Sequence, residues 1–225
     1  MPSSARPALV LQHGDSGPPD LLERWLRERE LPHLVHPAWR DPLPGDPSRF
    51  AFVASLGSQW SPAPDSGAPG WVADEVAFLR AAVDRGVPVL GLCFGGQALA
   101  AALGARVRRA ARGEVGWSDV ETRDPDLIPP GPWLQFHWDV FDVPAGATEV
   151  ARSATGPAAF TAGPHLGLQF HPETTPEVAD GWARVERDRL ATLGLTPESL
   201  LAQGRAVAER AAAAAFALFD RWYAR

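Results

Sequence analysis

The chain has 225 residues, 45% of them hydrophobic, which is enough for one large packed domain or for a domain with an appendage. Its formal net charge of −6 and the absence of a basic run argue against nucleic acid or an acidic membrane surface as the main partner. The single cysteine excludes an intramolecular disulfide and a cysteine-rich zinc site, and there is no apolar stretch of signal-peptide or membrane-spanning length, so we expect a protein of the reducing cytoplasm.

Strands and helices alternate over the first hundred residues. Apolar runs and helical spacing predict strands at Ala8–Leu11, Leu34–His36, Phe50–Ala54 and Val87–Leu90, and helices at Pro18–Glu30 and Val72–Arg85. This alternation indicates an α/β fold with a mainly parallel sheet covered on both faces and wound with right-handed crossovers. In such sheets, ligands bind beyond the carboxyl ends of the strands.

The pattern changes in the second half of the chain. From Val115 to Phe170 short β segments alternate with Pro/Gly turns, among them Trp133–Phe136 and Leu166–Phe170, and we expect them to add antiparallel strands to the sheet. Helices are predicted at Pro176–Leu190 and Pro197–Trp222, separated by a Gly-Leu-Thr-Pro break. We therefore expect a main domain of residues 1–177 and a C-terminal helical extension, residues 178–225, packed on it.

Cys93 lies at the centre of Gly91-Leu92-Cys93-Phe94-Gly95, between a predicted strand and an alanine-rich helical segment. A strand that turns sharply into a helix presents one side chain at its tip, and small neighbours allow the backbone to bend that tightly. Partial positive charge at the helix N-terminus favours the thiolate and leaves backbone N–H groups beside it. A buried apolar cysteine is the alternative. The two flanking glycines favour a nucleophile.

A cysteine nucleophile needs a base and a group that holds that base in place. Of the six histidines, His171 is best placed, because it ends a predicted strand and Pro172 stiffens the turn that brings Glu173 close to its imidazole. The alternative is a helix-entry turn in which Glu173 interacts with the helix dipole. Taken together with the turn at Cys93, the pattern predicts a catalytic triad of Cys93, His171 and Glu173.

The segments Gly91–Gln97 and His171-Pro172-Glu173 resemble the G-x-C-x-G-x-Q and H-P-E motifs of the class I (triad) glutamine amidotransferases, over residues 8–175. The segments Glu114–Trp117 and His137–Phe141 are most similar to the stand-alone GMP-synthase-like amidotransferases of bacteria. The resemblance implies a flavodoxin-like three-layer sandwich with a mainly parallel central sheet, added antiparallel strands and a C-terminal helical extension. Gly96 and Trp138 depart from the family pattern of histidine and glycine, so we expect a narrower or differently shaped pocket.

The resemblance also implies the reaction. Cys93 attacks the side-chain amide of glutamine, or another γ-glutamyl amide, and the backbone N–H groups of Phe94 and Gly57 stabilise the oxyanion. His171 protonates the leaving ammonia and then activates the water that hydrolyses the γ-glutamyl thioester. No metal or organic cofactor is required.

Three further residues are implied in substrate binding: Gln97 shapes the glutamine pocket, and His137 and Asp139 line it. The alternatives are a solvent-facing helix residue for Gln97 and a surface turn for the other two. Gly57 is, alternatively, an ordinary strand-to-loop glycine, because its neighbours differ from the usual Gly-Gly-Pro. For His13, which follows the first strand, we expect a polar loop residue, and the alternative is a residue at the rim of the site.

The acceptor of the nitrogen is not evident. A chain without lysine cannot supply the lysine of a P-loop, so an ATP-driven synthetase is not encoded here, and ammonia either passes to a separate acceptor synthetase subunit or is released. Two other functions stay open. One is a catalytically silent binding or regulatory protein on the same fold, against which the intact triad argues. The other is a DJ-1-like cysteine hydrolase, against which the His-Pro-Glu turn and Gln97 argue.

Overall fold

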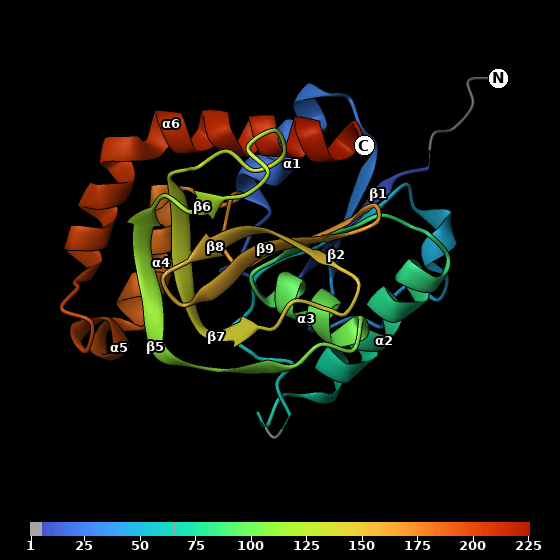
Figure 1. Cartoon of the computed structure of the whole chain (residues 1–225), viewed down its shortest axis with the longest axis horizontal. Coiled ribbons are helices and arrows are strands. Elements are labelled where there is room, and N and C mark those ends of the chain that lie inside the picture. Colours follow the sequence, from blue (N-terminus) through green and yellow to red (C-terminus); the bar gives the residue numbers. More distant parts are fainter. Residues whose placement is uncertain (1–5, 65) are drawn as a thin grey trace.

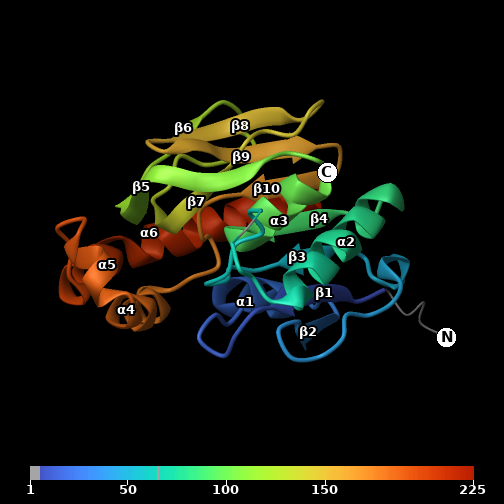
Figure 2. The ribbon, with the colours of Figure 1, turned by 90° about the horizontal axis from the view of Figure 1, so that it is seen from below.

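The computed structural model describes residues 6–64 and 66–225. Residues 1–5, which belong to the segment where no signal peptide is expected, lie outside the described residues. Within the described residues the main sheet has eight strands in the order β2-β1-β3-β4-β10-β9-β8-β6, which Figure 2 shows from β2 at the bottom to β6 at the top. Their bounds are β1 (Ala8–Gln12), β2 (His33–Pro37), β3 (Val53–Ser55), β4 (Val89–Leu92), β6 (Glu121–Thr122), β8 (Thr148–Ser153), β9 (Gly156–Ala162) and β10 (His165–Leu168).

Helices cover both faces of this sheet. One core cluster joins it to α1 (Asp20–Glu28) and α6 (Pro197–Tyr223), and the other joins it to α2 (Gly70–Asp84) and α3 (Phe94–Ala102). Figure 1 shows α6 along one side of the sheet and α2 and α3 on the other. Successive residues of a strand face opposite sides, so Val10 belongs to the first cluster and its neighbour Leu9 to the second. The predicted three-layer α/β sandwich is confirmed.

The strands from β2 to β10 in this order pair in parallel, and β9, β8 and β6 add antiparallel pairs, as expected. The described part of the chain also contains a separate antiparallel ribbon of β5 (Val107–Ser118) and β7 (Trp133–Phe141). The prediction that β structure begins at Val115 was wrong by eight residues. Residues 108–112 at the start of β5 are half-buried or exposed, three of them are arginines, and no apolar run marks this part of the strand.

The C-terminal region holds α4 (Pro176–Val185), α5 (Arg187–Ala191) and α6, and a short 3-10 helix, η1, lies at Pro47–Arg49. The single helix predicted at Pro176–Leu190 is interrupted at Glu186, where ψ is 24°. Thr196 and Ser199 form a capping box that starts α6. The division at residue 177 stays a prediction, but α6 packs on α1, α4 and β5. Among the described residues, no helix is long and apolar enough to cross a membrane.

Candidate active site

Cys93 stands alone between the end of β4 and the start of α3, in the strained conformation φ 52°, ψ −104°. A side chain on Gly91 would collide with the backbone of Gly95, and one on Gly95 would collide with that of Ser55. One on Gly96 would collide with the Leu168 carbonyl. These contacts explain why glycines surround the cysteine, and the turn is the predicted nucleophile elbow.

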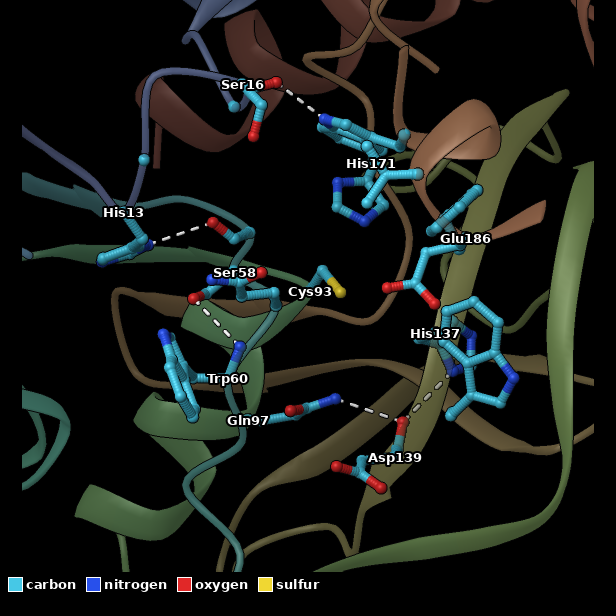
Figure 3. Close-up of a pocket in the computed structure, with 18 of the residues that line it drawn as sticks. His13, Ser16, Ser58, Trp60, Cys93, Gln97, His137, Asp139, His171 and Glu186 are labelled. Atoms are coloured by element: carbon cyan, nitrogen blue, oxygen red, sulfur yellow. Dashed lines mark hydrogen bonds between the residues drawn. The ribbon is translucent and has the colours of Figure 1, made fainter. Parts of the chain in front are cut away.

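The parallel pairing of β4 with β10 brings His171 to Cys93. Leu168 is in register with Leu92, and the Cys93 N–H donates to the Leu168 carbonyl at 2.9 Å. His171 therefore leaves the sheet at the same carboxyl edge as the thiol, where Figure 3 shows both side chains at one pocket. A backbone bond from the His171 N–H to the Leu134 carbonyl, 2.9 Å long, holds the segment against β7.

His171 and Glu173 form a buried pair, each side chain 3% exposed. Nδ1–H of His171 donates to Oε1 of Glu173 at 2.8 Å. Burial lowers the pKa of His171, but the charges of a Cys93 thiolate and of Glu173, with the hydrogen bonds to both, outweigh it and raise the pKa to about 10. Gln169 adds a donor, since its Nε2 lies 3.7 Å from the Cys93 sulfur. The surroundings thus favour a protonated His171 beside the Cys93 sulfur.

Gly57 lies directly against the His171 ring. A Cβ atom added to it would be 2.7 Å from His171 Cε1, so only glycine fits here without displacing the imidazole. The preceding carbonyl, of Leu56, accepts from the Gly95 N–H at 3.0 Å, which ties this loop to the elbow. Phe94 is the first residue of α3, where backbone N–H groups have no intrahelical acceptor. Both predicted oxyanion donors therefore lie close to Cys93 along the chain or through the Leu56–Gly95 bond.

A cavity of about 240 Å³ opens in front of the thiol. It is smaller than the pockets of about 300–1,000 Å³ that take drug-sized ligands, and so suits a small metabolite. Among the residues that line it are His13, Gly57, Cys93, Gln97, Arg109, His137, Trp138, Asp139, His171, Trp182, Val185, Glu186 and Arg189.

All three residues expected to bind substrate line this cavity (Figure 3). Gln97 is 3% exposed and donates through Nε2 to the Asp139 carbonyl at 3.1 Å, so the solvent-facing alternative is wrong. His137, also 3% exposed, donates through Nδ1 to the same carbonyl at 3.1 Å. Burial and the nearby charge of His171 lower the pKa of His137 to about 4, against an opposing effect of Glu114. A neutral His137 thus accompanies a charged His171.

Comparison with known proteins identifies the family. Residues 61–182 match the family model described as glutamine amidotransferase class-I. The chain belongs to this family. It is 42% identical over 112 residues to the GMP synthase [glutamine-hydrolyzing] of Thermomicrobium roseum, covering 47% of this chain and 19% of that protein. The corresponding protein of Vibrio vulnificus is 36% identical over 101 residues, covering 41% and 20%. The chain thus spans about a fifth of the length of the curated relatives it matches.

Solved structures agree with this assignment. A glutamine amidotransferase from Thermotoga maritima is 26% identical with a TM-score of 0.83, covering 96% of both chains. One from Methylobacillus flagellatus shares the fold, with a TM-score of 0.89 at 24% identity, over 98% of this chain and 95% of that chain. These matches confirm the predicted flavodoxin-like fold. The class-I assignment also favours an amidotransferase over a DJ-1-like hydrolase.

Part of the rim of this amidotransferase pocket was missed by the sequence analysis. Trp182, Val185, Glu186 and Arg189 reach the pocket from α4 and α5 and from the break between them. The Trp182 ring lies 5.0 Å from that of His171, and its Nε1–H donates to the Ser16 carbonyl at 2.7 Å. No motif marks these residues, because the fold alone brings the helices over the pocket.

Trp138 lines the same rim. The guanidinium of Arg189 lies 4.5 Å from the centre of its ring. A Trp side chain occupies space at the pocket wall that a glycine would leave open, which is consistent with the expected change in pocket shape.

His13 is the clearest correction to the sequence-based expectation. It is 7% exposed and lines the pocket, so it is not an ordinary polar loop residue. Its Nε2 lies 2.7 Å from Oε2 of Glu75, and its Nδ1 lies 3.1 Å from the Gly57 carbonyl oxygen. In the sequence, nothing distinguishes Glu75 from the other polar residues of its predicted helix, yet its side chain is fully buried.

Proposed function

We propose that this amidotransferase hydrolyses the side-chain amide of glutamine, or another γ-glutamyl amide, through a Cys93–His171–Glu173 triad. The observation that supports this most is the buried His171 ring, bonded to Glu173 at 2.8 Å and with its pKa raised to about 10 beside Cys93. An imidazolium at this position maintains a thiolate that can attack without first losing a proton.

The reaction follows from these positions. The Cys93 sulfur attacks the amide carbon, and the oxyanion accepts hydrogen bonds from the N–H groups of Phe94 and Gly57, each worth on the order of 3 kcal/mol in well-studied hydrolases. His171 gives its proton to the departing ammonia and leaves a γ-glutamyl thioester on Cys93. His171, now neutral and oriented by Glu173, takes a proton from water, and glutamate is released.

The cavity walls supply the substrate contacts. Gln97, the neutral His137 and the backbone of Asp139 form one polar network in the wall of the cavity (Figure 3). We assign this network to the glutamyl group, because it is buried and its shape is fixed by hydrogen bonds before substrate arrives.

We propose that the ammonia passes to a separate acceptor synthetase subunit, or is released where that subunit is absent. The support is that relatives named GMP synthase are about five times longer than the stretch they share with this chain. We also assign the protein to the cytoplasm, where a free thiol nucleophile stays reduced. Nucleic acid and membrane play no part in this proposal.

The decisive experiment offers purified protein glutamine and γ-glutamyl dipeptides and measures glutamate. A glutamine-like electrophile should label Cys93 stoichiometrically, and Cys93→Ala should lose both turnover and label. No glutamate from any substrate, with no label on Cys93, would refute the amidotransferase function.

A further inference from the structure

Three buried polar side chains outside the triad form a continuous chain of hydrogen bonds beneath the site. Ser55 ends β3, His13 follows β1, and Glu75 lies on α2. The Ser55 hydroxyl donates to Oε1 of Glu75 at 2.6 Å, and the other carboxylate oxygen lies 2.7 Å from Nε2 of His13. The side chains of His13 and Glu75 are both 0% exposed. Burying polar side chains costs free energy unless they are hydrogen-bonded, and each of these three has a buried partner.

This chain of hydrogen bonds ends at the backbone carbonyl of Gly57. Its carbonyl lies 3.1 Å from His13 Nδ1 and can only accept, so Nδ1 carries a hydrogen and donates it. The hydrogen between Nε2 and Glu75 is then an additional one, which makes the two side chains together an imidazolium–carboxylate pair or its proton-transferred equivalent. In both forms the donor to Gly57 is kept.

Two aromatic rings pack against the His13 ring. The ring centres of His13 and Trp71 are 5.3 Å apart with 7° between the planes, and those of His13 and Phe94 are 4.8 Å apart in an edge-to-face arrangement. Phe94 directly follows the nucleophile. The same ring therefore contacts both residues whose backbone N–H groups are the proposed oxyanion donors, Gly57 and Phe94.

We propose that His13, held by Glu75, is a positioning residue that fixes the peptide planes of the oxyanion loop. A trans peptide is planar with its C=O and N–H pointing in opposite directions, so a bond to the Gly57 carbonyl sets the direction of the following N–H and resists rotation of the loop. The Leu56 carbonyl is already held by Gly95 N–H at 3.0 Å. With both carbonyls held, the peptide planes on the two sides of Gly57 are fixed, including the plane that carries the proposed oxyanion N–H. This inference rests on the proposed function.

The test compares three variants that leave no unpaired carboxylate in the core. Glu75→Gln is the background, and His13→Asn and His13→Leu are each added to it. Asparagine carries an N–H donor on Cγ, where His13 has Nδ1, whereas leucine fills similar space without a donor. We expect kcat for glutamine in the leucine variant to fall about 100-fold below the background, as for a displaced reacting group or a lost oxyanion donor. The asparagine variant should recover most of that loss, with KM changing by less than about threefold in both.

Alkylation of Cys93 by iodoacetamide separates positioning from damage to the thiol. This reagent is attacked at a saturated carbon, where no oxyanion forms, and the chain has no other cysteine to react. We expect equal alkylation rates in all three variants. Equal kcat for the leucine and asparagine variants, or alkylation that falls in parallel with kcat, would overturn the inference. A wild-type protein that is alkylated but turns over no γ-glutamyl amide would refute the proposed function itself, and this inference with it.

Discussion

The substitution Gly57→Ala tests the contact between the Gly57 loop and His171. The added Cβ would lie 2.7 Å from His171 Cε1, whereas carbon atoms in contact settle at about 3.5–4.0 Å. The ring or the loop must therefore move by roughly 0.8 Å. The ring has little room to retreat, since Glu173 holds Nδ1 at 2.8 Å and the Trp182 ring lies 5.0 Å away.

A misplacement of about 1 Å at a reacting group can cost on the order of 100-fold in rate. We therefore expect kcat of Gly57→Ala with glutamine to fall by about 10- to 100-fold, or about 1.4–2.7 kcal/mol in activation free energy. Gly57 does not have a positive φ, so backbone strain adds nothing to this loss. Glutamate release under saturating glutamine measures the effect.

Gly17→Ala is the matched control. Gly17 lines the same cavity, but a Cβ added to it meets nothing within 4 Å. Its kcat should match that of the wild type. Full activity in Gly57→Ala, in a protein whose thermal unfolding is unchanged, would show that the loop does not bear on His171 as the structure indicates.

Three other predictions concern charge and pocket shape. Glu173→Gln removes a carboxylate that raises the pKa of His171, so the ring-proton NMR titration midpoint should move down from about 10; an unchanged midpoint contradicts the pair. The folded-state pKa of His137 is about 4, below its ordinary 6.5, so unfolding is favoured increasingly as the pH falls from 6.5 to 4, by up to about 3 kcal/mol. Urea unfolding should show this loss in the wild type and a smaller one in His137→Gln; equal losses would be inconsistent with a buried neutral imidazole. Trp138→Ala should widen the cavity and raise kcat/KM for γ-glutamyl dipeptides relative to glutamine, and substrate profiles that do not change would show that Trp138 does not limit the pocket.

Much of the site could be predicted because it is encoded locally. The turn at Cys93 needs small residues within a few positions of it, and the structure shows each glycine facing a backbone that excludes a side chain. His171 and Glu173 likewise form their hydrogen-bonded pair within a single turn, with Pro172 between them. The alternation of strands and helices over the first hundred residues followed from hydrophobic periodicity and turn residues.

Other features depend on how distant segments meet. The bond between His13 and Gly57 exists because β1 and β3 are parallel neighbours with Leu11 in register with Ser55. Each of the two bonded residues lies two positions after its residue of that pair. No local sequence pattern around His13 or Glu75 predicts that these two residues, 62 positions apart, form a hydrogen bond. The sequence-based view of His13 as a polar loop residue failed for that reason.

The sequence by itself determined the chemical groups of the site and the sharp turn that presents the thiol, because both depend on short-range steric and bonding constraints. Only the tertiary structure decided what surrounds them: the buried His13–Glu75 pair beside Gly57, and the rim that α4 and α5 contribute with Trp182 and Arg189. Strand register and helix packing bring these groups together, and they are properties of the whole fold.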